Sequence, residues 1–424
     1  MIEIQQFTGP FGIPILYQRM PEMVKSVAMS WVIFTGAADD ESVGKPGLYH
    51  WFEHVPFRGT AKYPGGYAAT KGWATKYAGH INARTGMQYT VYESSVPLEV
   101  WDEALSVITD LFGRPLIRED DVAAEREIIR QEIAGSLGKA DYSAFTKLSE
   151  ILYGGHPFGH RVLGTEETLD TMDVSTLCHA YKAGYDRSRA MLIIVGNIPI
   201  DEIQQKLANL AEVLPANGLS ERRVPANRGF LPEWKSGKTT TVETEFVSSL
   251  VFMLFPLRKK DTVNTFLTTD IFSALFQFGG LSSPLYRIAR EERKLVYKTF
   301  CVGKGTPARN YFGFCAETKM ENIDAVLTAF RDVVNDPQVR SSARLEEIKQ
   351  GTKHLFNMRP IDPEAFRDIA LQRYLGANRI VNDSHYEQIM NEIERDQVEA
   401  QLNQLSPDKA HAVVFKGTGS KSVC

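Results

Sequence analysis

The residues best suited to chemistry in this sequence are two histidines and a glutamate in one short segment, His50, Glu53 and His54. They form the pattern H-x-x-E-H, a known arrangement of zinc ligands. On an α-helix, positions i and i+4 lie on one face a turn apart, so His50 and His54 can present two imidazole nitrogens to one ion. Glu53 points close to the same face, where a carboxylate can take a proton from a water activated by the metal.

The alternative interpretation of this segment is an ordinary amphipathic helix with a solvated polar face. The neighbours Trp51, Phe52, Val55 and Phe57 argue against it, because they make the segment apolar nearly all round and predict that it is buried. Charged or titratable groups on a buried helix need partners. A metal ion is the most economical partner for these side chains.

A third metal ligand must come from elsewhere, since catalytic zinc usually has three protein ligands and one open position. The best candidate segment is 119–133, a predicted helix with acidic residues in its first turn. Glu125 and Glu132 are two helical turns apart and are therefore expected on one face, beside Ile128, Ile129 and Ile133. Two interpretations of these carboxylates stay open: they bind the metal and orient its ligands, or they form ion pairs with Arg and Lys.

The order Gly-Leu-x-His-x-x-Glu-His-x-x-Phe-Arg-Gly-Thr around these histidines, followed downstream by Glu-Arg-Glu-Ile-Ile-Arg-Gln-Glu-Ile, resembles the pitrilysin or insulinase family of zinc peptidases. That family includes the mitochondrial processing peptidases. The resemblance implies that His50, His54 and Glu132 are the zinc ligands. It also implies that Glu53 is the catalytic base and that Glu125 is the second glutamate that supports the site.

The resemblance also implies which residues bind the substrate. Asn82 and Ala83 match an edge strand against which the substrate backbone pairs, whereas the residues alone favour a turn for Asn82. Arg290 and Tyr297 match an Arg and a Tyr that reach the substrate carbonyl and the developing oxyanion. Their alternative interpretation is a charged helix end and a strand aromatic. His80 matches no ligand and is interpreted as a surface histidine.

The pattern of strands and helices predicts an α+β protein made of two similar halves. Residues 1–214 form the predicted amino-terminal half with the metal site, and 215–238, rich in Pro, Gly, Arg and Asn, form the predicted linker. Residues 239–424 repeat the order of elements, but the helix at 265–278 that takes the place of the metal helix has no histidine. The resemblance implies that the two halves face each other as a clamshell.

Composition restricts the class of protein. Hydrophobic residues at 43% and charged residues at 24% are typical of soluble globular proteins. A net charge of −4 gives no basic footprint for nucleic acid, and no run of about eighteen apolar residues spans a bilayer. The four cysteines are far apart in sequence and indicate thiols of a reducing compartment. Without a visible leader pattern, the expected location is the cytoplasm.

Together these observations predict a zinc-dependent endopeptidase with one Zn²⁺ per chain, acting on peptides or unfolded polypeptide segments. Family members of this length hold one pair of halves, so a complete chamber is expected to require two chains in a homodimer. Two alternatives stay open: a catalytic subunit that needs a related partner in a heterodimer, and a non-catalytic structural member of the family. The presence of Glu53 beside the metal ligands argues against the last, because a scaffold needs no base there.

Overall fold

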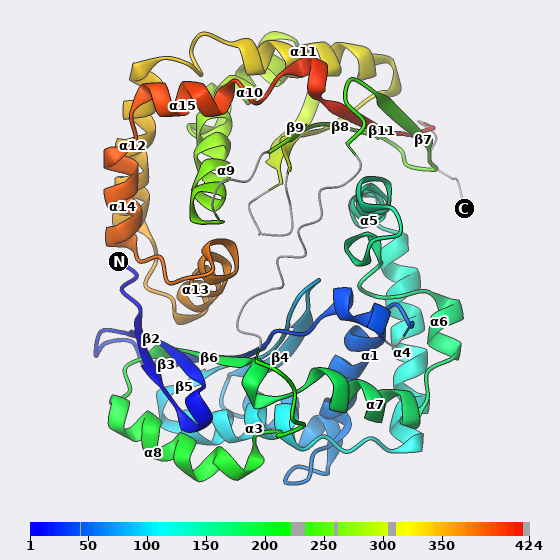
Figure 1. The fold of residues 1–424 in the computed structure, drawn as a ribbon, viewed down its shortest axis with the longest axis vertical. Coiled ribbons are helices and arrows are strands. Elements are labelled where there is room, and N and C mark those ends of the chain that lie inside the picture. Colours follow the sequence, from blue (N-terminus) through cyan, green and yellow to red (C-terminus); the bar gives the residue numbers. More distant parts are fainter. Residues whose placement is uncertain (43, 222–233, 258–261, 304–310, 419–424) are drawn as a thin grey trace. The chain divides into compact units, whose positions relative to one another are not determined.

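The computed structural model describes residues 1–424 except 43, 222–233, 258–261, 304–310 and 419–424. The chain forms two compact units (Figure 1). The amino-terminal unit consists of Ile2–Ala226 together with Pro360–Arg373, and the carboxy-terminal unit of Met1, Asn227–Arg359 and Tyr374–Cys424. The halves predicted from the sequence did not anticipate this return of the chain at 360–373. Half of the predicted linker, 222–233, lies outside the described residues.

A six-stranded sheet is the frame of the amino-terminal unit, with the strand order β1-β2-β6-β3-β5-β4. Strand β2 runs parallel to β6, and the other neighbours pair antiparallel. The inner strands are buried along almost their whole length, which explains their runs of β-branched and aliphatic residues. The strands are β1 (Gln5–Thr8), β2 (Pro14–Arg19), β3 (Ser26–Ile33), β4 (His80–Thr85), β5 (Thr90–Pro97) and β6 (Ala190–Gly196).

Helices pack on this sheet and carry the candidate site. Helix α3 lies against β3 and β5, and Trp31 of β3 donates a hydrogen bond to Thr109 of α3 (Nε1 to Oγ1, 2.9 Å). The short helix α6 is capped by Thr165, whose side-chain hydroxyl accepts a hydrogen bond from the backbone N–H of Thr168. The helices are α1 (Leu48–His54), α2 (Lys71–Thr75), α3 (Trp101–Gly113), α4 (Glu119–Leu137), α5 (Ala140–Tyr153), α6 (Glu166–Asp170), α7 (Val174–Gly184) and α8 (Ile200–Leu210).

The carboxy-terminal unit repeats the plan of one sheet with helices, so the predicted α+β class with two similar halves is confirmed. Its sheet has the order β7-β11-β8-β10-β9. The strands are β7 (Thr239–Glu243), β8 (Ser249–Pro256), β9 (Val296–Val302), β10 (Tyr311–Thr318) and β11 (His411–Lys416), and the helices that precede residue 360 are α9 (Thr262–Gln277), α10 (Pro284–Tyr286), α11 (Ile323–Asn335) and α12 (Ser342–Met358).

Three helices occupy a stretch, 358–409, to which the sequence pattern assigned no element. They are α13 (Pro363–Ala377), α14 (Asp383–Glu392) and α15 (Arg395–Leu402). Helices α14 and α15 are short and bury few residues, among them Met390 and Val398, so they lack the long apolar stripe by which a helix is detected in a sequence.

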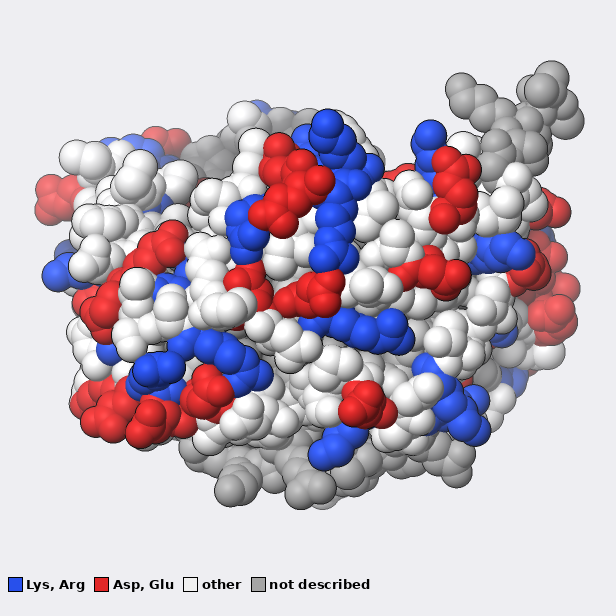
Figure 2. All heavy atoms as spheres, turned by 90° about the horizontal axis from the view of Figure 1, so that it is seen from above, with Lys and Arg blue, Asp and Glu red and all other residues white. Residues whose placement is uncertain are grey.

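The next two features are the distribution of charge on the surface and the character of the helices. On the face seen in Figure 2, Lys and Arg side chains are interspersed with Asp and Glu side chains. Among the described helices, none has the length and apolar character needed to traverse a bilayer.

Candidate active site

Helix α1 carries the three motif residues and is buried on nearly every side, as its apolar neighbours predict. Trp51 and Phe52 are completely buried, and His50 and Glu53 are also buried. The helix begins after Gly47, which has a left-handed φ of 89°. A Cβ at this position would lie 2.6 Å from the Cα of Gly164, so the backbone here requires glycine.

Asp40 is a buried carboxyl group at the beginning of α1. Its Oδ2 accepts a hydrogen bond from the backbone of Gly47 at 2.7 Å, and its Oδ1 accepts one from the backbone of Tyr49 at 3.0 Å. Burial raises the pKa of Asp40 to about 8, although the backbone hydrogen bonds act in the opposite direction. Since first-turn N–H groups have no partner within a helix, Asp40 satisfies them and fixes where α1 begins.

The side chains of His50 and His54 converge with that of Glu132 from α4. His50 Nε2 lies 3.7 Å from Glu132 Oε1, and His54 Nε2 lies 3.5 Å from Glu132 Oε2. Ligands of a tetrahedral zinc ion with bonds of about 2.0 Å are about 3.3 Å apart. The donor set therefore fits zinc and leaves a fourth position open. Within the described ranges, no other group of His, Cys, Asp and Glu side chains converges in this way.

The two histidines differ in their surroundings. Burial lowers the pKa of His50 to about 3, with a further contribution from His54, so His50 is neutral and its ring is in the form that binds a metal. For His54, burial opposes the charge, but the hydrogen bond that its ring donates to Glu125 and the charges of the neighbouring carboxylates outweigh burial and raise the pKa of His54.

Glu125 of α4 is fully buried behind His54. Its Oε2 lies 3.2 Å from His54 Nδ1, and its Oε1 accepts hydrogen bonds from Arg58 Nε and from the hydroxyl of Tyr67, the latter at 3.1 Å. Burial alone would raise the pKa of Glu125, but the hydrogen bonds from His54 and Arg58 lower it. A carboxylate in this place fixes the ring of a metal-binding histidine and leaves Nε2 for the ion.

The sequence left two interpretations open for the glutamates of α4, metal binding and ion pairing. In the structure, each interpretation fits one of the two residues. Glu132 joins the histidines in the group that could hold a metal. Glu125 forms the ion pair with Arg58 and orients His54 from behind.

The carboxyl group of Glu53 lies on the same side of α1, and its Oε2 accepts a hydrogen bond from the hydroxyl of Thr85 on β4 at 2.6 Å. Burial raises the pKa of Glu53 to about 7, while His54 and the hydroxyl of Thr85 act against this rise. A carboxyl group that titrates near neutrality is suited to accept and release a proton during a reaction.

A cavity of about 540 Å³ connects these groups with strand β4. Strand β4 stands at the end of the sheet order, with β5 as its neighbour, and its Asn82 and Ala83 line the cavity. The interpretation of Asn82 as a turn residue is therefore wrong, and the edge strand implied by the resemblance is present. Lys71 of α2 lies over the ring of Phe57 and donates a hydrogen bond to Asn82 Oδ1 at 3.1 Å.

Arg290 and Tyr297 lie in the carboxy-terminal unit, where the structure brings them together. The guanidinium carbon of Arg290 is 5.2 Å from the centre of the Tyr297 ring, and Tyr297 is 81% exposed. Arg290 belongs to a π-helical segment, Arg287–Glu292, and Lys294 has a left-handed φ of 53° as the chain turns into β9. Their roles toward a substrate stay predictions.

Sequence reasoning missed the functions of Asp40 and Thr85. A signal for Asp40 exists, since it precedes a buried helix whose N-terminal residue, Gly47, has no side chain to cap it. Thr85 follows Ala83 by two positions on a strand, so the two side chains point to one face. No sequence rule predicts that this face meets Glu53.

Family models and known relatives match this chain over most of its length. The model "Insulinase (Peptidase family M16)" matches residues 17–166, a range that includes the metal group and Glu53. The model "Peptidase M16 inactive domain" matches residues 171–351. The second match contains Arg290 and Tyr297.

Three known proteins illustrate the similarity. An "Uncharacterized zinc protease" of Rickettsia bellii is 25% identical over 339 residues, which are 80% of this chain and 79% of that protein. "Mitochondrial-processing peptidase subunit beta" of Neurospora crassa is 23% identical over 215 residues, 51% of this chain and 44% of that protein. The crystal structure of a protease from Helicobacter pylori shares the fold, with a TM-score of 0.83, 18% identity and coverage of 98% of this chain and 100% of that one.

Proposed function

The chain belongs to peptidase family M16, and on this premise we propose that it is a zinc-dependent endopeptidase that hydrolyses peptides or unfolded polypeptide segments. The observation that carries the proposal is the convergence of His50, His54 and Glu132 beside the buried carboxyl group of Glu53. A structural member of the family would have no use for a base in this position. The name of the Rickettsia relative, a zinc protease, supports the same reaction.

Zinc held by the three ligands would supply a Lewis acid that polarises the scissile carbonyl and lowers the pKa of a water molecule. Glu53 accepts the proton of the attacking water at its carboxylate and then delivers it to the leaving amine. Burial raises the pKa of Glu53 in the metal-free fold, which favours a carboxyl group that can both accept and release a proton. Thr85 holds one oxygen of this carboxyl group, and Glu125 keeps the ring of His54 turned toward the ligand set.

Strand β4 supports the proposed substrate class. A peptide added to an edge strand is bound through its main chain, so many sequences are accepted, and an extended or unfolded segment is required. In the proposal, the peptide pairs beside Asn82 and Ala83. Arg290 and Tyr297 donate hydrogen bonds to the developing oxyanion, an effect worth about 3 kcal/mol for each donor in comparable sites.

For the quaternary state we propose a homodimer, because Arg290 and Tyr297 are present in the same chain as the metal group. A heterodimer with a related chain is the second candidate. The similarity to a protein named as the beta subunit of a processing peptidase favours it.

The proposal is tested by incubating the purified chain alone with a quenched fluorescent peptide library, with chelator and then with added zinc. Cleavage that stops with chelator and returns with zinc is expected. Glu53→Gln should keep zinc and lose cleavage, whereas Glu127→Gln, an exposed position on α4, should leave both unchanged. Bound zinc without cleavage by the wild-type chain would contradict a self-sufficient peptidase.

A further inference from the structure

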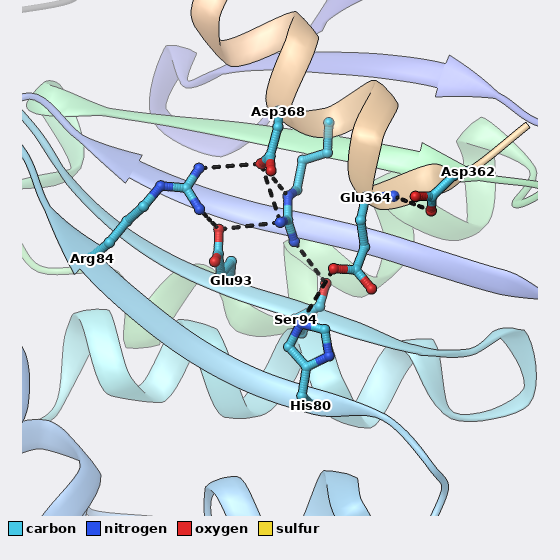
Figure 3. A network of polar contacts seen from close by, with 8 residues as sticks. His80, Arg84, Glu93, Ser94, Asp362, Glu364 and Asp368 are labelled. Carbon is cyan, nitrogen blue, oxygen red and sulfur yellow. Dashed lines mark hydrogen bonds and ion pairs between the residues drawn. The ribbon is translucent and has the colours of Figure 1, made fainter. Parts of the chain in front are cut away.

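Residues 360–373 come late in the sequence and yet fold as part of the amino-terminal unit. They include the first three turns of α13, which lies over β4 and β5 in Figure 3. Polar side chains of α13 point down to these two strands, and side chains of the strands point up to meet them. The segment is therefore tied to the edge strand that lines the candidate active site.

Arg367 is the centre of this contact and is almost completely buried, with a side chain 3% exposed. Its Nη2 lies 3.3 Å from Glu93 Oε2 on β5 and 3.2 Å from the Oδ1 of its neighbour Asp368. Its Nη1 donates a hydrogen bond to the backbone carbonyl of Ser94 at 3.4 Å. A buried guanidinium needs partners of this kind, because an unpaired charge in the interior is strongly unfavourable.

Arg84 of β4 completes the contact from the strand side. Its Nη1 donates to Glu93 Oε2, and its Nη2 donates to Asp368 Oδ1 at 3.2 Å. Glu93 and Asp368 thus each contact both Arg84 and Arg367, and the four charges alternate in sign around a closed ring. The ring links β4, β5 and α13 (Figure 3).

A second contact holds the opposite end of β4. His80 Nε2 lies 3.4 Å from Glu364 Oε2 on the first turn of α13. The surface histidine of the sequence prediction is half exposed and has this partner. His80, Asn82 and Arg84 share one face of the strand, since side chains alternate along it. Segment 360–373 therefore contacts this face at both ends of β4. Asn82, in the middle of the strand, accepts a hydrogen bond from Lys71 instead.

We propose that residues 360–373 are a brace that holds edge strand β4 in the form to which a peptide is added, and that Arg367 is its positioning residue. The inference rests on the proposed function. Arg367 acts through Glu93 and Arg84 and not on the reacting atoms. A strand already ordered before the peptide arrives reduces the entropy lost on binding, so the brace favours substrate binding and not the chemical step.

The variants are chosen to separate a local effect on β4 from a general loss of stability. Arg367→Met removes the guanidinium and keeps an apolar stem, and Arg367→Lys keeps the charge. The matched control is Arg344→Met in the carboxy-terminal unit. Arg344 is also buried, and its guanidinium donates to the backbone carbonyls of Ala274, Leu275 and Phe278.

The experiment measures amide hydrogen exchange of residues 80–85 in the full chain, together with zinc content and peptide hydrolysis. Arg367→Met should speed exchange at 80–85 about tenfold, because the strand opens locally more often. It should raise KM about fivefold or more, with kcat and zinc content within about twofold of wild type, because the ordering of β4 would then occur on binding. Arg367→Lys should recover part of both effects, and Arg344→Met should change neither.

Unchanged exchange at 80–85 in folded Arg367→Met would overturn the brace, and so would equal acceleration in Arg344→Met. If Arg367→Met does not fold, Asp368→Asn replaces it, because Asp368 is half exposed and its loss leaves Arg84 paired with Glu93. Asp368→Asn must then speed exchange at 80–85 for the inference to hold. A wild-type chain that cleaves no peptide refutes the self-sufficient peptidase of the proposed function, whereas the exchange measurement still decides on the brace.

Discussion

Glu125 Oε2 lies 3.2 Å from the Nδ1 of His54, and the Nε2 of the same ring lies 3.5 Å from Glu132 Oε2. One imidazole therefore connects a buried carboxylate to the group that could hold a metal. Arg58 and Tyr67 donate to the other oxygen of Glu125, so the carboxylate is itself held in place. The orientation of His54 is set by the fold before any ion binds.

The first prediction concerns this orientation. Glu125→Gln should reduce zinc affinity about 10- to 100-fold, the usual effect of removing a carboxylate behind a metal-binding histidine. A competition titration against a chromogenic chelator measures the change. Glu127→Gln, on the exposed side of the same helix, is the control and should bind zinc as the wild type does. Equal affinities in all three proteins would show that His54 needs no orienting carboxylate.

The second prediction follows from the buried carboxyl group of Glu53. In the metal-free fold its pKa is about 7, raised by burial from an ordinary value of 4.5. Between these pH values the folded chain keeps a proton that the unfolded chain has lost, so the free energy of unfolding falls as the pH rises. Glu53→Gln has no proton to lose. It should be more stable than wild type above pH 7, by up to about 3 kcal/mol, and equally stable below pH 4.5.

Urea unfolding of both proteins in chelator, at several pH values, measures this difference. The stability gap should open as the pH rises and stay constant above neutrality. A gap of the same size at every pH would mean that the effect of Glu53→Gln comes from packing and not from the ionised carboxylate.

The third prediction concerns the start of α1. Asp40→Ala removes the acceptor of the Gly47 and Tyr49 backbone N–H groups and should lower the free energy of unfolding by about 1–2 kcal/mol, the cost of losing a helix cap. Zinc affinity should fall with it, because α1 positions both histidines. Denaturant unfolding and a zinc titration test the two effects. Glu127→Ala, at an exposed position in the middle of α4, should change neither, and a stable Asp40→Ala with full zinc affinity would refute the cap.

The fourth prediction concerns Tyr297 in the carboxy-terminal unit, which is proposed to act in catalysis but not in metal binding. Tyr297→Phe removes the phenol proposed to donate to the oxyanion, so kcat should fall about 100-fold or more with a smaller change in KM. Zinc affinity should stay the same, since Tyr297 belongs to the unit that does not hold the metal group. Steady-state kinetics on one cleaved peptide measure the effect, with Tyr286→Phe as the control. Wild-type kcat in Tyr297→Phe would remove Tyr297 from the catalytic residues.

Local patterns were sufficient to locate α1 and its chemistry. His50, Glu53 and His54 share a helical face because of the geometry of the helix alone, and the apolar neighbours indicated burial. The apolar runs of β3 and β6 are likewise sequence signals of buried strands. The choice of Glu132 over Glu125 as the metal ligand came from the resemblance, since both residues occupy one face of α4.

Contacts between distant segments were decided only by the tertiary structure. Thr85 meets Glu53, Asp40 meets the start of α1, and Arg367 meets Glu93 across 274 positions of the chain. No periodicity connects such pairs, because each depends on how sheets and helices pack. The amino-acid sequence by itself determined which side chains could bind zinc and move a proton. The packing of α4, β4 and the returning segment 360–373 decided which side chains lie in contact. Such long-range contacts follow from burial of the whole core and not from local spacing.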